Sequence, residues 1–234
     1  MRASGILMPV FSLPGPFGIG TLGAEAFAFV DFLARARQTY WQILPIGPTG
    51  YGDSPYQSFS AFAGNPYFID YRVLAEDGWL TPDEVPAPVP VGTVDYGALY
   101  NERPAILKRA ADRLLAEPSK AYTDFCAAQD FWLDDYALFM ALKAEQGQAG
   151  LADWPDALRT REPSALAAAR VRLADAVDYH RPCSSSSSLS GAPSRPTPTK
   201  RASSWWAISP STSARIPATS GPGRSFSRPM GRST

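Results

Sequence analysis

The order of apolar and polar positions predicts a strand, a helix and a second strand at the start of the chain. Gly5 to Leu13 is a short apolar run that ends in a Pro-Gly turn, and Tyr40 to Ile46 is a second such run. Between them, Thr21 to Arg37 places its apolar residues on one face of a helix, with Thr21 as the expected N-cap. Strand, helix and strand at this spacing indicate a βαβ unit, the opening of a parallel α/β sheet or barrel.

Further along the chain, the apolar residues recur at the spacing of an α-helix. Tyr100 to Glu117, Tyr122 to Gln146 and Ser164 to Tyr179 each predict a helix, with Ser164 as a candidate N-cap. Before these helices, Tyr67 to Tyr71 is expected to be a strand segment, and the proline-rich stretch Asp83 to Val94 an extended connector. We interpret the helices as insertions around a barrel, not as its strands.

The loop Gly47 to Tyr56, which follows the second predicted strand, is the most informative stretch of the sequence. It holds three glycines, two prolines and two tyrosines in one short segment. Rigid turns that carry aromatic faces beside short polar groups suit a sugar, which has apolar faces and an equator of hydroxyls. In a (β/α)₈ barrel, the loops at the carboxyl ends of the strands build the active site, and this loop has that position. The alternative is a tight surface turn that caps a strand.

Several motifs, in order, resemble one known family. They are Ser4 to Pro9, Phe11 to Gly20, the run Tyr40 to Tyr71 with Ser58 to Tyr67 inside it, Val94 to Gly97, and Asp134 to Lys143. Together they resemble the 4-α-glucanotransferases of glycoside hydrolase family 77, also called amylomaltases or disproportionating enzymes. The resemblance runs from about Ser4 to Arg181 and then stops.

The resemblance implies an α/β fold, the N-terminal part of a (β/α)₈ TIM barrel with helical insertions. It also implies transfer of α-1,4-glucan segments to the 4-hydroxyl of glucose or a maltooligosaccharide, by a retaining double displacement and without an organic cofactor. Retaining enzymes use two carboxylates about 5 Å apart. In the family these groups lie beyond the point where this chain leaves the pattern, so no catalytic residue is expected here and the chain alone should be inactive.

Five residues inherit expected binding roles from the resemblance. Asp53, Ser54 and Tyr56 align with substrate-binding positions, and Tyr51 and Tyr100 with an accessory glucan-binding site on the surface. A tyrosine offers a flat apolar face for a glucose ring and a hydroxyl at its tip. Each role has a structural alternative: Tyr56 could pack under the loop, Asp53 could brace the turn, and Tyr51 and Tyr100 could be half-buried core residues.

Other polar residues have simpler structural interpretations. Asp134 and Asp135 are neighbours on a predicted helix and point about 100° apart, so they cannot face one bond. His180, the only histidine, is expected at a helix end as a partner of the helix dipole. Cys126 and Cys183 are the only cysteines, so we expect neither a disulfide framework nor a metal site.

Composition divides the chain at Pro182. Residues 1–181 hold 15 basic and 22 acidic residues, whereas residues 182–234 hold 7 basic residues, no acidic residue and 16 serines. A segment of this kind buries too little apolar area to fold, so a disordered tail, a linker or a basic arm is expected. A sharper hypothesis is translation out of frame. Codons compatible with Cys183 onward, re-read one nucleotide earlier, can encode LQFLFF and later RIQLVGDIPIYV, in the order that the resembled family carries.

The expected partners are α-1,4-glucans and maltooligosaccharides, with neither nucleic acid nor a membrane. No apolar run is long enough to cross a membrane and no secretory signal is visible, so a cytoplasmic location is the default. Two rivals remain open: an α-amylase-like hydrolase on the same fold, and a non-catalytic glucan-binding protein whose basic tail serves another interaction.

Overall fold

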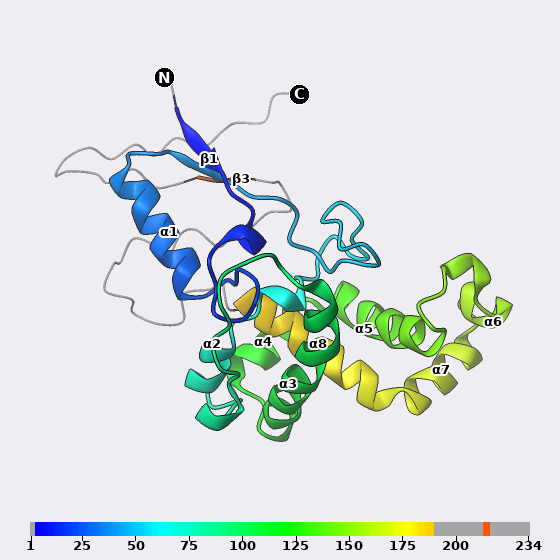
Figure 1. Ribbon diagram of the computed structural model, residues 1–234. Helices are drawn as coiled ribbons and strands as arrows, with labels where there is room; N and C mark the ends of the chain where they lie inside the picture. Colours follow the sequence, from blue (N-terminus) through cyan, green and yellow to red (C-terminus); the bar gives the residue numbers. More distant parts are fainter. Residues whose placement is uncertain (1–2, 190–212, 216–234) are drawn as a thin grey trace, which may run out of the picture.

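The computed structural model describes residues 3–189 and 213–215 of the chain, and it is mainly helical (Figure 1). Its strands are β1 (Gly5–Leu7), β2 (Tyr40–Gln42) and β3 (Ser213–Arg215). Its α-helices are α1 (Ala24–Arg35), α2 (Tyr71–Glu76), α3 (Tyr96–Ala116), α4 (Lys120–Ala128), α5 (Asp130–Glu145), α6 (Asp156–Arg159), α7 (Pro163–Arg172) and α8 (Ala174–Leu189). Short 3₁₀ turns lie at Val10–Ser12, Pro66–Phe68, Pro82–Glu84 and Leu151–Asp153.

The predicted βαβ unit is confirmed at the start of the chain. β1 and β2 are parallel, with Ile6 opposite Trp41, and α1 is the crossover between them. Both strands are shorter than expected, because the chain turns into a 3₁₀ turn after Pro9 and leaves the ladder after Gln42. β3 adds an antiparallel neighbour to β2. The described strands form an open sheet, so closure into a barrel stays a prediction.

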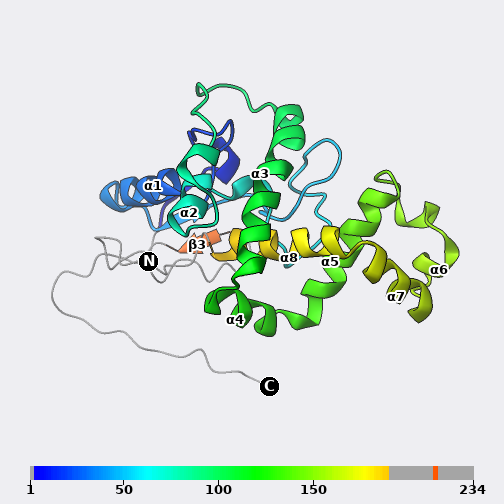
Figure 2. The same cartoon turned by 90° about the horizontal axis from the view of Figure 1, so that it is seen from below.

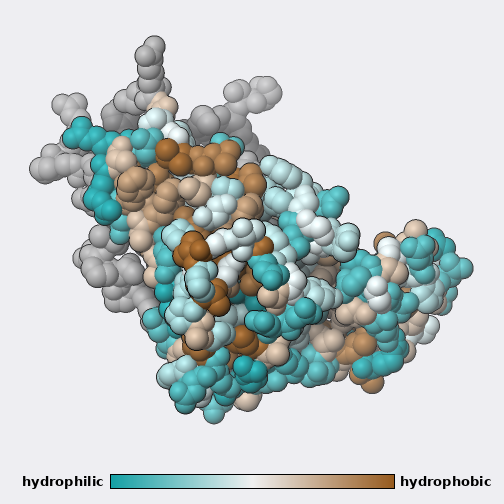
Figure 3. All heavy atoms as spheres, in the orientation of Figure 1, coloured by the Kyte–Doolittle hydropathy of each residue, from teal (hydrophilic) through white to brown (hydrophobic). Residues whose placement is uncertain are grey.

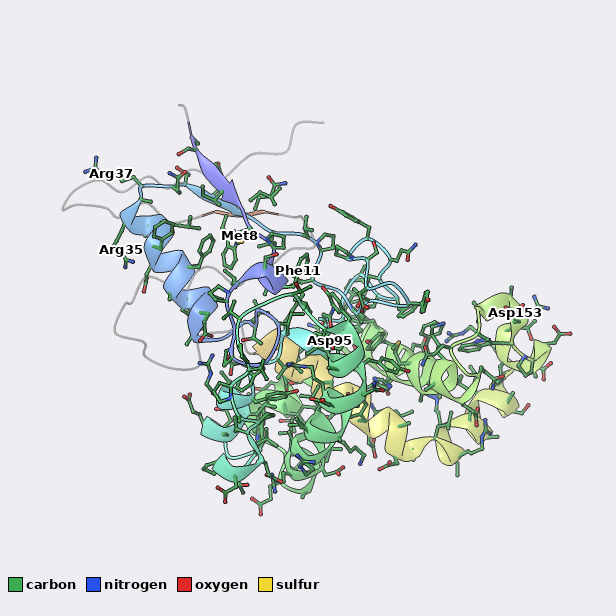
Figure 4. All side chains as sticks on the ribbon, in the orientation of Figure 1. Met8, Phe11, Arg35, Arg37, Asp95 and Asp153 are labelled. Carbon is green, nitrogen blue, oxygen red and sulfur yellow. The ribbon has the colours of Figure 1, made fainter. Side chains whose placement is uncertain are left out.

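The first predicted strand is also less buried than expected. All three residues of β1 are exposed, and Leu7 keeps 55% of its surface. The core of this region lies below the sheet instead, where Trp41, Leu33 and Val10 pack together. Figure 4 shows Met8 and Phe11 close together where the chain leaves β1, with Arg35 and Arg37 at the far end of α1. β1 is therefore an uncovered edge of the sheet.

Thr21 is not the N-cap that the sequence predicted for α1. The N-cap is Gly23, and the buried Thr21 hydroxyl donates to a carboxylate oxygen of Asp70 at 2.9 Å. Asp70 is fully buried and caps α2 by accepting from the backbone N–H of Arg72. Arg72 in turn forms a bidentate pair with Glu25 of α1. This polar network ties the start of α1 to the start of α2.

The helical region is organised around α8, which packs along α5 and α3 (Figure 2). One apolar core joins α2, α3 and α8 around Tyr71, Leu107 and Cys183. A second core joins α5, α7 and α8 around Ala141, Trp154 and Val177. Helices α2, α3, α5, α7 and α8 therefore bury apolar residues against one another.

Several predicted boundaries are wrong because tertiary contacts override the local pattern. The expected helix Tyr122 to Gln146 is two helices that break at Gln129, whose side chain accepts a hydrogen bond from the indole of Trp132. The expected strand Tyr67 to Tyr71 is a 3₁₀ turn followed by the first residue of α2. Ser164 is not an N-cap, since Glu162 precedes α7.

The predicted tail begins too early. Residues 182–189 belong to α8, and Pro182 lies inside that helix. Cys183, Ser184, Ser185 and Ser186 are buried, and Ser213–Arg215 forms β3. The expectation of disorder is therefore wrong for these residues. For 190–212 and 216–234 it lies outside the described residues. Over the described ranges, none of the helices is both long and apolar enough to cross a membrane.

Candidate functional site

The loop between residues 47 and 58 is held as a closed turn. Thr49 and Ser58 form an antiparallel bridge at its base, and the N–H of Asp53 donates to the carbonyl of Gly50 at 3.1 Å. A side chain at Gly47 would collide with Ser58, which lies 2.2 Å from the position of such a Cβ. Gly52 has a φ of +85°, a conformation that glycine adopts without strain. The glycines that the sequence singled out therefore shape the loop.

Tyr51 and Tyr56 stand out from this loop into solvent. Tyr51 is completely exposed and Tyr56 keeps 73% of its surface. The structural alternative for Tyr56, packing under the loop, is therefore not what the structure shows. Large aromatic side chains on a constrained loop lose little further freedom when a ligand binds. These two residues are available for stacking on a ligand.

Asp53 braces the turn through a contact between side chains. One of its carboxylate oxygens accepts from the hydroxyl of Thr49 at 3.3 Å, and its φ of +52° is unusual for a residue with a side chain. Ser54, partly buried, begins the next turn by accepting from the N–H of Gln57. Burial raises the pKa of the Asp53 carboxyl, and the Thr49 hydrogen bond opposes this in part.

Asp53 faces two tyrosines that the sequence did not single out as site residues. Asp53, Tyr67 and Tyr96 line one small cavity of about 10 Å³ under the loop. Burial, together with the charge of Asp53, raises the pKa of Tyr67 to about 12. The two rings are 6.2 Å apart. A carboxylate beside two neutral phenols can hold hydroxyl groups, but one carboxylate cannot supply the acid and nucleophile pair of glycoside chemistry.

A signal for Tyr96 was present in the sequence. It belongs to the motif Val94 to Gly97, which carried the family resemblance, but spacing along the chain gave no reason to bring it near Asp53. The structure places it at the first turn of α3, which Asp95 caps by accepting from the N–H of Ala98 at 2.9 Å (Figure 4). The N-cap of α3 therefore fixes the position of the Tyr96 ring beside the loop.

Tyr100, one helical turn after Tyr96, is 61% exposed. It is close enough to Tyr67 for their hydroxyls to interact electrostatically. Within the described residues no ring contact joins Tyr100 to Tyr51. The structure therefore shows neither tyrosine as a core residue, and it places Tyr100 near the Asp53 cavity rather than against Tyr51.

A larger cavity of about 360 Å³ lies beside this site. It is bounded by the turn that holds Phe17, by the connector that holds Val89, and by Leu99 and Arg103 of α3. None of the five predicted binding residues lines it. Its volume is at the lower end of the range for small-molecule pockets.

The remaining polar residues of the sequence analysis have structural roles. Asp134 pairs with Arg181, and Asp135 with Arg161 and Arg170. His180 is not at a helix end: it lies inside α8, with its ring edge against Tyr136 and Tyr179. Burial lowers its pKa to about 4. In the part of the chain that the structure describes, no three His, Cys, Asp or Glu side chains gather as metal ligands.

With this geometry in place, comparison with known proteins gives a consistent answer. The family model for 4-alpha-glucanotransferase matches residues 8–185, which is most of the chain. The chain belongs to the 4-alpha-glucanotransferase family. A 4-alpha-glucanotransferase of Thermus thermophilus is 50% identical over 183 residues, which cover 76% of this chain and 36% of that protein. A 4-alpha-glucanotransferase of Streptococcus pneumoniae is 46% identical over 186 residues, which cover 77% of this chain and 37% of that protein.

A solved structure supports the same family. The amylomaltase from Streptococcus agalactiae in complex with acarbose matches this chain with a TM-score of 0.76 and 41% identity, covering 81% of this chain and 39% of that one. The chain therefore spans a little over a third of the length of these relatives. The resemblance that the motifs predicted is confirmed, whereas the roles of the five binding residues stay predictions.

Proposed function

We propose that this chain is the N-terminal part of a 4-α-glucanotransferase, and that its 47–58 loop binds α-1,4-glucan. The observation that carries the proposal is the loop itself. It follows β2 at the carboxyl end of a parallel strand pair, and it presents Tyr51 and Tyr56 to solvent. In barrel enzymes this end of the strands carries the substrate. The family of the chain supports the choice of a glucan.

The five residues divide into two proposed sets. Asp53, Ser54 and Tyr56 hold the glucan near the reacting bond, with Asp53 oriented by Thr49 and supported by Tyr67 and Tyr96. Tyr51 and Tyr100 hold a more distant part of the glucan by stacking, because both are exposed aromatic rings with no described ring partner. An exposed ring gains contact area only when a ligand covers it.

The finer chemistry is proposed from the family alone. The whole protein transfers a glucan segment to the 4-hydroxyl of an acceptor sugar through a covalent glycosyl-enzyme, and an acceptor in the site excludes water. The pair of carboxylates that this needs lies outside residues 1–181, so we propose that the chain is inactive by itself.

The binding proposal is tested by calorimetric titration of the 234-residue chain with maltoheptaose. Tyr51→Ala and Tyr100→Ala should each weaken binding by about 3- to 10-fold, the usual range for one aromatic stacking contact. Phe32→Ala, which removes an exposed ring from α1, is the control and should leave the affinity unchanged. Equal affinity in all four proteins would contradict the proposal.

An experiment that distinguishes transfer from hydrolysis requires a protein with the full length of the relatives. Incubation with maltotriose should give maltooligosaccharides of new, greater lengths. Reducing ends that accumulate without longer products would instead identify an α-amylase-like hydrolase. Glucan binding with neither product would identify a binding protein.

A further inference from the structure

The 47–58 loop is closed by its own hydrogen bonds, but these bonds do not fix its direction relative to the helices. Thr49 and Ser58 pair at its base. The N–H of Asp53 donates to the carbonyl of Gly50 inside the loop. A ligand loses affinity when it has to order a mobile loop, because that ordering costs conformational entropy. The contacts that join the loop to the rest of the fold therefore matter for binding.

Phe59, which follows the loop directly, contacts the loop with its backbone and with its ring. Its N–H donates to the carbonyl of Pro48 at 3.4 Å. Its ring points at Gly50, where the Cβ of any other residue would lie 2.7 Å from Cζ at the tip of the ring. The ring therefore fills the space that a side chain at position 50 would need, and Gly50 lets it lie against the loop.

The same ring is also in contact with α5. The ring of Phe139 lies 6.2 Å from it, which is within the range of aromatic pairs. The ammonium of Lys143 lies 4.9 Å from the centre of the Phe59 ring. A cation at this distance is attracted by the electrons of the ring. Phe59 therefore joins the loop to α5 through one aromatic and one cation–π contact.

The two α5 residues that hold the ring are themselves fixed. Lys143 is buried, and its ammonium donates to the carbonyls of Gln148 and Ala149 at 3.0 and 3.1 Å. The ring of Phe139 stacks on Trp154 at 5.4 Å, and the indole of Trp154 donates to the same Ala149 carbonyl. Because a buried charge is costly without such partners, the ammonium stays where its hydrogen bonds are satisfied. Phe59 therefore rests against a well-ordered part of the helical region.

We propose that Phe59 is a positioning residue for the glucan-binding loop. Its ring fixes the direction of the loop against α5, and so it holds Tyr51 and Tyr56 where a glucan can stack on them. Phe59 acts through the loop and is not itself a glucan contact. This inference rests on the proposed function of the loop, but part of its test involves no sugar.

The first experiment measures hydrogen exchange of the loop amides in the complete 234-residue chain. Phe59→Leu keeps an apolar side chain but removes the ring, so the hydrogen-bonded amides of Asp53 and Gln57 should exchange about 5- to 10-fold faster. Phe62→Leu is the matched control, since it removes a ring of the same segment that also contacts α5, at Trp132. It should leave both rates unchanged. Unchanged rates in Phe59→Leu, or equal acceleration in both variants, would overturn the proposal.

A double-mutant cycle tests the contact between the ring and the loop by calorimetric titration with maltoheptaose. Gly50→Ala places a methyl group against the tip of the Phe59 ring, so it should displace the loop and weaken binding by about 3- to 10-fold. In the Phe59→Leu chain the shorter side chain leaves room for the methyl group. There the same substitution should weaken binding by less than about 2-fold. An equal effect of Gly50→Ala in both chains would overturn the proposal.

The same titrations separate this inference from the proposed function. Phe59→Leu should weaken binding of maltoheptaose by about 3- to 10-fold, and Phe62→Leu should not. Full affinity in Phe59→Leu, together with weaker binding in Tyr51→Ala, would overturn the positioning role and leave the proposed function standing. Faster exchange in Phe59→Leu with equal affinity in every variant would instead contradict the proposed function, and would support the role of Phe59 in holding the loop.

Discussion

The strand region and the helical region of this chain differ in how completely each one pairs its own backbone. β1 leaves Ile6 and Leu7 exposed, and α1 leaves Phe32 more than half exposed. Figure 3 shows apolar atoms gathered over the part of the molecule that holds β1 and α1, with a mostly hydrophilic surface over the helices. A helix satisfies its own backbone, whereas a strand needs a neighbour on each side. The helical region therefore completes its backbone hydrogen bonds within its helices, whereas β1 is an edge strand among the described strands. Both regions expose some apolar side chains, such as Leu7 and Val171.

The link between the two regions offers the largest expected effect. Asp70→Ala removes a buried carboxylate that accepts from Thr21 and Arg72. It leaves the Thr21 hydroxyl without this partner, so the free energy of unfolding should fall by about 4 kcal/mol. Urea unfolding of the original chain and of the Asp70→Ala variant measures this loss of free energy. The variant Asp70→Asn keeps an acceptor for the cap, so its free energy of unfolding should fall by less. Equal losses in the two variants would show that only the charge of Asp70 matters.

A pair of leucine truncations tests the contrast between the regions directly. Leu107 is buried between α2, α3 and α8, so Leu107→Ala should cost about 3 kcal/mol of unfolding free energy. Leu7→Ala makes the same change on the exposed strand β1 and should cost less than about 0.5 kcal/mol. Chemical unfolding of both variants provides the comparison. A large cost at Leu7 would show that β1 is covered after all.

The helical core should also depend on pH through His180. Burial lowers the pKa of His180 to about 4, below the ordinary value of 6.5. As the pH falls, His180 therefore takes up a proton in the unfolded chain before it does so in the folded chain. The free energy of unfolding decreases as the pH falls from about 6.5 to 4. The loss from this group should reach about 2 kcal/mol near pH 4.5. His180→Phe keeps a ring between Tyr136 and Tyr179 and should flatten the stability profile between pH 4 and 6.5. An unchanged profile would assign the dependence to carboxylates such as Asp70.

The smallest effect on stability is expected at the loop. Tyr51 is fully exposed, so Tyr51→Ala should change the free energy of unfolding by less than about 0.5 kcal/mol while it weakens glucan binding. Thermal unfolding with and without maltoheptaose separates the two properties. A lower melting temperature without the sugar would mean that Tyr51 also supports the loop.

Much of the strand region was predictable because its signals are local. The order of strand, helix and strand followed from apolar runs and one helical period, and the loop followed from its glycines and prolines. The role of Asp53 was only half predictable. A turn position was visible, but its neighbours Tyr67 and Tyr96 come from segments that meet only in the folded chain.

The helical region was predicted less well at its boundaries. The break at Gln129 depends on a hydrogen bond from the Trp132 side chain and on the packing of α5 against α8. Threonine is a residue type that often caps helices, but the hydroxyl of Thr21 donates its hydrogen bond to Asp70, which is 49 residues away along the chain. In both cases a contact formed in the folded state outweighs a preference of a few tenths to one kcal/mol.

The sequence by itself determined the family, the opening βαβ unit and the tyrosine-bearing loop, because short-range periodicity and ordered motifs carry that information. Only the tertiary structure decided that Asp70 joins the two regions, that Asp53 faces a pair of tyrosines, and that the first serines after Pro182 are buried in a helix. Those outcomes depend on which distant apolar surfaces need covering, and Cys183 and Ser186 lie beside Leu107 and Leu114 because α8 covers that surface.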